Sequence, residues 1–219
     1  MSLLLYGIVE AGEDSGLRGM GVDEQPLRAV REGSLLAIVS DHHGRAPDPT
    51  TSALLAYERA VRRLMEGGAV LPVQFGSVLD DEGAVQELLR RRGKDLLAQL
   101  DRVRGAVEIG LRASWRDRPP TSDVRPQSGT SYLRDRLELR QHARRVASEL
   151  DPLTAVARSS RRALAPRPDL PVLDSYLVDR GRVSEFVALV AQLDRHLDDV
   201  ELVCTGPWPP YSFAEGAPT

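Results

Sequence analysis

Hydrophobic residues occur along this chain in two patterns, short apolar runs and helical periodicities, and together they predict a mixed α and β protein. Residues 3–10 form an apolar run that ends at acidic and glycine residues, which is typical of a buried strand. Residues 27–31 alternate between apolar and polar side chains, and residues 35–39 form another apolar run. Because Glu32-Gly33 suits a turn between them, these two segments are predicted to pair as a hairpin.

The rest of the first hundred residues is predicted to form two amphipathic helices with a strand between them. The first helix covers residues 51–66, and its inward face carries Leu54, Tyr57, Val61, Leu64 and Met65. Residues 70–79 are predicted to be a strand on which Leu71, Val73 and Phe75 share one face. Asp80-Asp81 is well placed to cap the second helix, because a carboxylate accepts hydrogen bonds from the free N–H groups of a first turn.

From residue 106 onward the pattern predicts the order β-α-β-β-α-β, which is that of a ferredoxin-like domain. Leu133 and Leu137 are expected to face inward on the first helix of this region, and Val187 on the second. Residues 116–129, rich in Pro, Ser, Asp and Arg, are predicted to be a loop. We therefore expect an α+β fold with two small mixed domains, the second ferredoxin-like. The strands of that second domain are expected at residues 106–115, 155–164, 172–178 and 200–204, the helices at 130–150 and 183–197, and the domains at 1–104 and 105–219.

The overall composition argues against several classes of protein. The chain has 219 residues, a net charge of −3 and a pI of about 5.9, unlike the strongly basic domain of a nucleic-acid binder. Cys204 is the only cysteine, so no intramolecular disulfide can form, and this fits a reducing cytoplasm. No apolar stretch approaches the ~20 residues that span a bilayer, and the first apolar run lacks the basic region of a signal peptide. We expect a cytoplasmic protein that binds neither nucleic acid nor membrane.

No catalytic pattern stands out in the sequence, which has no phosphate loop, dinucleotide fingerprint or nucleophile elbow. His42-His43 could suggest a metal, but neighbouring side chains on a strand point to opposite faces, so a surface turn is favoured. The arginines at 90–92 and between 134 and 145 are interpreted as solvated helix faces. If one of them is a binding surface, its partner is an acidic protein. We expect no enzyme activity, no metal and no cofactor.

The C-terminal tail, residues 206–219, contains an unusual concentration of aromatic residues and prolines. Trp208, Tyr211 and Phe213 lie within a few positions of Pro209 and Pro210. Because proline fixes φ and removes a donor, this segment is expected to be extended, close to polyproline II. Its rings either pack on their own domain as a structural latch or press into the grooves of a partner, and the sequence leaves both interpretations open.

The residues Gly206-Pro207-Trp208-Pro209-Pro210-Tyr211-Ser212-Phe213, which we call the aromatic segment, resemble the closing signature of the gas vesicle protein F/L family. Residues 5–9 resemble the opening strand of that family, and residues 36–40 its second core strand. Residues 71–78 resemble its central motif, and residues 176–178 its penultimate strand. The resemblance therefore extends over nearly the whole chain.

This resemblance implies a minor component or assembly factor of gas vesicles, which are hollow, gas-filled protein shells. It implies binding to the small, hydrophobic major shell protein and to other gas vesicle accessory proteins, a location in the cytoplasm and at the gas vesicle, and no enzymatic activity. It also implies two α+β domains, the second a modified ferredoxin-like fold. Two other classes stay open, a ferredoxin-like module that senses a small molecule and an unrecognised enzyme.

Overall fold

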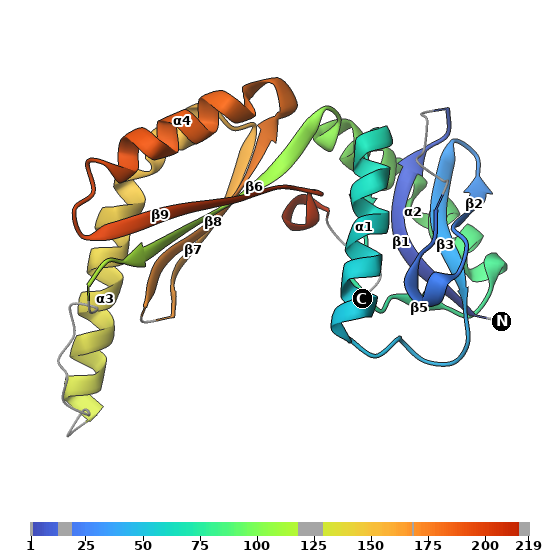
Figure 1. The fold of residues 1–219 in the computed structure, drawn as a ribbon, viewed down its shortest axis with the longest axis horizontal. Helices are drawn as coiled ribbons and strands as arrows, with labels where there is room; N and C mark the ends of the chain where they lie inside the picture. The colour runs from blue at the N-terminus through green and yellow to red at the C-terminus, as the bar shows by residue number, and fades with distance from the viewer. Residues whose placement is uncertain (1, 13–18, 118–128, 168, 215–219) are drawn as a thin grey trace. The chain divides into compact units, whose positions relative to one another are not determined.

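The chain folds into two compact units, each built on its own β-sheet (Figure 1). The structure is a computed structural model, which describes residues 2–12, 19–117, 129–167 and 169–214. Unit 1 contains residues Met1–Ala106 and Trp208–Thr219, and unit 2 contains Val107–Pro207. In the described residues, two antiparallel sheets and four α-helices give the α+β class that the sequence predicts. Most of the loop predicted at 116–129 lies outside the described residues.

The sheet of unit 1 is centred on the first apolar run of the chain. Its strand order is β2-β3-β1-β4, and the short β5 also pairs with β1. The predicted hairpin is confirmed: β2 and β3 pair antiparallel, and Gly33, at φ 59°, takes the left-handed conformation that such a turn needs. The strands are β1 (Ser2–Glu10), β2 (Arg28–Glu32), β3 (Leu35–His42), β4 (Leu71–Pro72) and β5 (Val78–Leu79).

Helices α1 (Thr51–Gly67) and α2 (Glu82–Val103) cover the two faces of this sheet (Figure 1). Residues 3–9 of β1 are buried throughout, which requires a layer on either side of the strand. Both helices begin at a side-chain cap. Thr50 Oγ1 accepts from the N–H of Ala53 at 3.2 Å, and Asp81 Oδ1 accepts from that of Ala84 at 2.8 Å, as the sequence predicts for Asp81.

The single strand predicted at residues 70–79 is wrong. The structure has two short strands, β4 and β5, separated by a turn. Gly76 lies at φ 88°, a conformation that a strand does not contain, and the Ser77 hydroxyl donates to the carbonyl of Gln74 at 2.9 Å. Gly76 and the Ser77 hydroxyl therefore form a turn that divides the predicted strand in two.

Unit 2 has the predicted element order, with the strands in the spatial order β7-β8-β6-β9. Its core includes Tyr176 of β8 and Phe186 of α4, whose ring centroids lie 5.0 Å apart. Strands β7 and β8 pair antiparallel. The elements are β6 (Ala106–Trp115), α3 (Gly129–Glu149), β7 (Ser159–Arg167), β8 (Leu170–Asp179), α4 (Val183–Asp194) and β9 (Val200–Trp208).

Several side chains predicted to face inward are exposed instead. Leu54 on α1 retains 42% of its surface, and Val187 on α4 retains 44%. The difference is largest on α3, where Leu133 is 66% and Leu137 62% exposed. A helical periodicity identifies the apolar face of a helix, but it does not say how far along that face another element packs.

The aromatic segment also differs from the prediction, which places it with the second domain. The structure groups the chain from Trp208 onward with unit 1. Trp208 contacts α1 and Phe213 contacts α2. The prediction differs because these contacts join residues far apart in the sequence, which no local pattern indicates. Unit 1 is therefore assembled from both ends of the sequence.

Candidate functional site

The aromatic segment forms a short folded structure at the end of β9. Trp208 is the last residue of that strand, and a 3-10 turn over Tyr211–Phe213 follows the two prolines. The N–H of Tyr211 donates to the carbonyl of Pro209 at 2.8 Å, and that of Phe213 donates to Pro210 at 3.1 Å. The segment is thus extended as far as Trp208, as the sequence predicts, but it ends in a turn that the prediction does not include.

The side chains of this segment divide into buried and half-exposed groups. Phe213 is only 2% exposed, and Pro209 and Pro210 are buried. Trp208 retains 37% of its surface and Tyr211 40%. Since a ring loses most of its hydration only when it is buried, Phe213 is the main anchor, and the other two rings keep surface that solvent can reach.

Helix α1 contacts the segment through Arg62. The Arg62 guanidinium carbon lies 5.1 Å from the centroid of the Trp208 ring, which is a cation–π distance. Glu58, one helical turn earlier, holds the same guanidinium, with its Oε1 2.9 Å from Nε and 2.7 Å from Nη2. The carboxylate holds the planar guanidinium in place, and the same guanidinium lies over the Trp208 ring.

Helix α2 contacts the segment at its other end. Arg102, in the last turn of α2, donates from Nη2 to the carbonyl of Phe213 at 2.6 Å. A hydrogen bond from a charged donor is stronger than one between neutral groups. A buried ring and a charged hydrogen bond to its backbone therefore help to hold the aromatic segment on unit 1.

An aromatic cluster in the core of unit 1 lies next to the segment. The Tyr57 ring stacks on Tyr6 at 4.8 Å and meets Phe75 edge-on at 5.3 Å. Burial raises the pKa of Tyr57 well above its ordinary value, and the neighbouring Tyr211 and Tyr6 raise it further. Burial also raises the pKa of Tyr211, with Glu58 as the second cause. These phenols stay neutral at physiological pH, which suits packing and hydrogen bonding rather than proton transfer.

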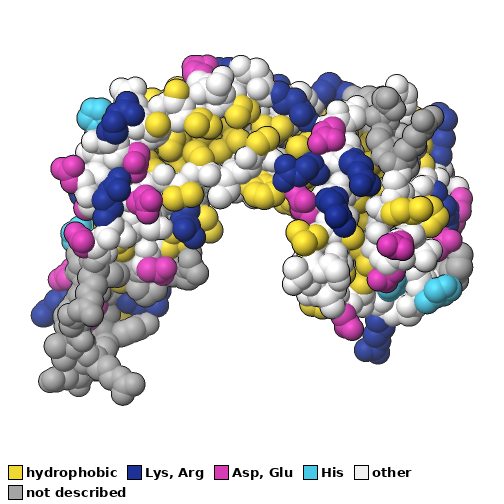
Figure 2. All heavy atoms as spheres, in the orientation of Figure 1, with side chains coloured by type: hydrophobic (Ala, Val, Ile, Leu, Met, Phe, Trp, Pro, Cys, Tyr) yellow, Lys and Arg dark blue, Asp and Glu magenta, His cyan; other side chains and the backbone are white. Residues whose placement is uncertain are grey.

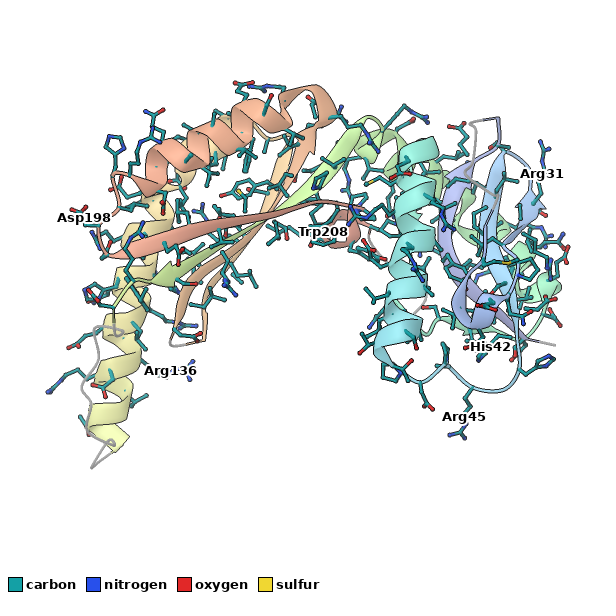
Figure 3. The ribbon with its side chains drawn as sticks, in the orientation of Figure 1. Arg31, His42, Arg45, Arg136, Asp198 and Trp208 are labelled. Carbon is teal, nitrogen blue, oxygen red and sulfur yellow. The ribbon has the colours of Figure 1, made fainter. Side chains whose placement is uncertain are left out.

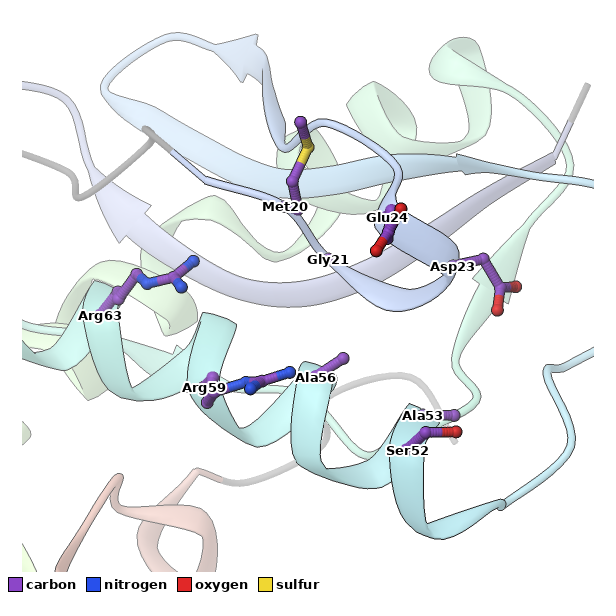
Figure 4. A pocket seen from close by; sticks show the side chains of 9 residues that line it. All are labelled: Met20, Gly21, Asp23, Glu24, Ser52, Ala53, Ala56, Arg59 and Arg63. Atoms are coloured by element: carbon purple, nitrogen blue, oxygen red, sulfur yellow. The ribbon is translucent and has the colours of Figure 1, made fainter.

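A pocket of about 710 Å³ opens beside α1, between that helix and the turn at residues 20–24 (Figure 4). Arg59 and Arg63 line it from the helix, and Asp23 and Glu24 line it from the turn. The volume is in the range of ligand-binding pockets in proteins. We call it the α1 pocket. The sequence contains no signal for it, because its walls come from residues that are unremarkable when taken separately.

The histidines show ordinary local contacts. His42 Nε2 lies 2.5 Å from the carbonyl oxygen of Arg45, in the loop after β3 (Figure 3). His142 and His196 place a ring nitrogen 2.9 and 2.7 Å from the carbonyl four residues earlier. Within the described ranges, no group of three or more His, Cys, Asp or Glu residues could hold a metal ion. The helices described there also include none long and apolar enough to cross a membrane.

The partners of the aromatic segment could not be found from the sequence. Arg102 and Phe213 are 111 residues apart, and nothing in the pattern links them. Sequence reasoning names the five residues Trp208, Pro209, Pro210, Tyr211 and Phe213, and the structure brings all of them together on unit 1. Sequence reasoning does not identify the residues that these side chains lie against, which are Tyr57, Arg62 and Arg102.

The fold and this site define a two-unit α+β protein whose C-terminal aromatic segment packs on its N-terminal unit. The family model described as "Gas vesicle synthesis protein GvpL/GvpF" matches residues 2–215. The chain therefore belongs to the gas vesicle protein F/L family, and it has a role connected with gas vesicles.

Individual relatives agree with this assignment. The chain is 29% identical to gas vesicle protein F of Streptomyces sp. (strain CB03234), over 98% of this chain and 100% of that protein. It is 30% identical to gas vesicle protein L of the same strain, over 89% of this chain and 85% of that protein. The two identities are nearly equal, so they do not separate the F type from the L type.

Two solved structures share the fold. The crystal structure of the gas vesicle protein GvpF from Anabaena sp. PCC7120 superimposes with a TM-score of 0.83 at 18% identity, covering 98% of this chain and 96% of that one. The GvpF structure from Microcystis aeruginosa gives 0.81 at 19% identity, covering 98% and 99%. The arrangement of elements is therefore retained where most residues differ.

Proposed function

We propose that this protein is a gas vesicle accessory or minor structural protein that binds the major shell protein and assists nucleation or assembly of gas vesicles. The observation that carries the proposal is the family match over residues 2–215. It acts in the cytoplasm and at the vesicle, needs no cofactor and performs no catalysis. Its partners are the major shell protein and other gas vesicle accessory proteins.

Exposed leucines on α3 support a role in binding an apolar partner. Leu133 and Leu137 are four positions apart, so they lie on one face of the helix, and each exposes more than 60% of its surface. No residue from 133 to 142 is buried. A pair of leucines at this spacing is the kind of anchor that a helix offers to a hydrophobic groove. A small, hydrophobic shell protein is a suitable partner for it.

A second apolar surface lies along α4 of unit 2. Figure 2 shows hydrophobic side chains gathered along α4 and between α4 and β9. Val187 on this helix is 44% exposed. Contiguous apolar surface on a folded protein is typical of an interaction site, because its exposure to water is unfavourable.

We propose that the aromatic segment is in the first place a latch within unit 1. Buried Phe213 and the hydrogen bond from Arg102 support this role. The exposed parts of Trp208 and Tyr211 remain for a partner. Trp208, Pro209, Pro210, Tyr211 and Phe213 are thus assigned to fastening the chain end, with two rings available for contact.

We also propose that unit 2 is a ferredoxin-like domain. Its element order β-α-β-β-α-β and its strand order β7-β8-β6-β9 support that assignment. The alternative function, a ferredoxin-like module that senses a small molecule, would place a ligand in this unit. The α1 pocket lies in unit 1, so it does not favour that alternative.

The test is a pull-down of the purified major shell protein by the full chain. We expect binding, and we expect the double substitution Leu133→Gln and Leu137→Gln to weaken it at least about tenfold, because two large apolar contacts are lost. Leu55→Gln is the matched control, since Leu55 is an exposed helical leucine of unit 1, at 54%. If the folded wild-type chain fails to bind at several salt concentrations, the proposal is wrong. If the double variant binds like the control, α3 is not the contact surface.

A further inference from the structure

The α1 pocket combines four charged side chains that do not neutralise one another. Arg59 and Arg63 lie one helical turn apart on α1, and Asp23 and Glu24 lie on the facing turn (Figure 4). Among the described residues, none of these four belongs to an ion pair within 4 Å. By contrast, Arg62, also on α1, forms an ion pair with Glu58 at 2.7 Å.

One nitrogen of the half-exposed Arg63 is buried and has no hydrogen-bond partner among the described residues. Nη1 of Arg63 has lost its access to solvent and has no hydrogen-bond partner in the described part of the chain. The guanidinium lies against Gly19, where an added Cβ would come within 2.3 Å of that nitrogen. Folding has thus desolvated a charged donor without replacing its hydrogen bond to water. Such a group is costly, and no ligand reaches this nitrogen, but the rest of the Arg63 side chain lines the pocket, where an acceptor can bind its other N–H groups.

The opposite wall of the pocket is the turn at residues 20–24, which has an unusual backbone conformation. Gly21 allows the turn to approach the core closely, because a Cβ there would lie 2.1 Å from the Tyr6 hydroxyl. Asp23 and Glu24 both adopt positive φ, at 53° and 55°, which is unfavourable for residues with side chains. This backbone places two carboxylates at the rim, facing a helix that carries two guanidinium groups. The remaining wall includes the short side chains of Ser52 and Ala56, which leave room for an incoming main chain.

We propose that the α1 pocket binds a segment of a partner protein that presents an acidic side chain to Arg59 and Arg63 and a basic side chain to Asp23 and Glu24. A carboxylate suits the two arginines, because guanidinium groups bind carboxylates with paired hydrogen bonds. A polyanion such as phosphate fits less well, since the two carboxylates at the rim repel it. The site deepens the proposed function, and it rests on that function only in that the occupant is a protein.

The experiment follows the arginine Nε–H signals of the ¹⁵N-labelled full chain by NMR. The probe is a blocked hexapeptide that carries one Glu and one Lys four positions apart, and the matched peptide carries Gln at both positions. Arg59→Gln and Arg63→Gln assign the two signals. Arg91, an exposed arginine on α2, is the internal control. Glutamate alone and inorganic phosphate alone are titrated separately.

We expect the Glu/Lys peptide to shift the Arg59 and Arg63 signals with saturation, at a dissociation constant on the order of 1 mM for so few contacts. The Gln peptide should leave both signals unmoved. In Arg63→Gln, the dissociation constant measured from the Arg59 signal should rise about tenfold. Asp23→Asn with Glu24→Gln should weaken peptide binding while strengthening phosphate binding. No saturable shift with the Glu/Lys peptide overturns the proposal. Equal or tighter binding of free glutamate or phosphate also overturns it, because the site then needs no protein segment. The shell protein is absent from this test, so its result is independent of the pull-down.

Discussion

Two faces of α1 use the same residue type in opposite ways. On one face, Arg62 is paired with Glu58 and covered by the Trp208 ring, so its charge and its planar surface are both used inside the molecule. On the other face, Arg59 and Arg63 line a pocket and have no ion-pair partner in the described part of the chain, and one nitrogen of Arg63 is buried. The comparison indicates that the chain itself supplies the partners of the Glu58–Arg62 face, which we call the completed face. The Arg59–Arg63 face, which we call the open face, is available to a ligand. Four predictions test this difference.

The largest effect is expected at the anchor of the completed face. Phe213→Ala removes a ring that is 2% exposed, and it should lower the free energy of unfolding by about 3–4 kcal/mol. The hydrogen bond from Arg102 goes to the main chain, so the substitution leaves its acceptor in place. Chemical denaturation of the full chain measures the change. Val187→Ala, at a 44% exposed position, should cost less than about 0.5 kcal/mol. Equal losses in the two variants would contradict the role of Phe213 as the anchor.

A smaller loss is expected at Trp208, which is 37% exposed. Trp208→Ala should cost about 2 kcal/mol, because only part of the ring is removed from water in the fold. Arg62→Gln keeps the ring and removes the cation, and it should cost less than about 1 kcal/mol. Thermal melting together with shell-protein binding separates latch from interface. A lower melting temperature with binding intact indicates a latch, whereas lost binding at an unchanged melting temperature would contradict it.

The completed face should also weaken at high pH. Burial raises the pKa of Tyr211 and of Tyr57, so above the ordinary tyrosine pKa of about 10 the unfolded chain ionises before the folded one. Stability is therefore fully present below about pH 10 and is lost as the pH rises through the folded values. Tyr211→Phe should reduce this loss by about 0.5 kcal/mol per pH unit, after allowance for solvent screening of a 40% exposed side chain. Denaturation between pH 9 and 11.5 is the measurement, and identical slopes would count against the assignment.

The smallest effect, or a gain, is expected on the open face. Arg63→Met keeps the length of the side chain and removes a buried nitrogen that has no partner among the described residues. The free energy of unfolding should stay the same or rise by up to about 1 kcal/mol. Differential scanning calorimetry of the ligand-free protein is the check. A loss above about 1 kcal/mol would mean that the unpaired guanidinium is structural, and the contrast between the two faces would disappear.

Local signals predict much of this fold. The β2–β3 hairpin follows from an alternating strand, a glycine turn and an apolar run, and each of these acts over a few residues. The cap at Asp81 is predictable for the same reason, because a capping carboxylate needs only the next turn of backbone. The α+β class depends on such elements alone.

Long-range packing could not be predicted in the same way. Leu137 and Val146 fit the same helical periodicity, yet the first is 62% exposed and the second is buried, because the described core reaches only the C-terminal half of α3. The destination of Phe213 depends on a contact with Arg102, 111 residues away. In the sequence the pocket arginines look the same as Arg62. They differ only in the structure, where Arg62 pairs with Glu58 and the pocket arginines have no ion-pair partner among the described residues.

The composition of unit 1 from Met1–Ala106 and Trp208–Thr219 has a consequence for synthesis on the ribosome. At about 5–20 residues per second, the chain needs on the order of 5–20 s to translate the intervening sequence of unit 2 before Trp208 is made. During that interval the aromatic cluster around Tyr57 has no Tyr211 beside it, and the Arg62 face has no ring. Release of a truncated chain leaves the same surface uncovered. Unit 1 is therefore completed only after unit 2 has been translated, and a chain that stops before Trp208 cannot finish folding it.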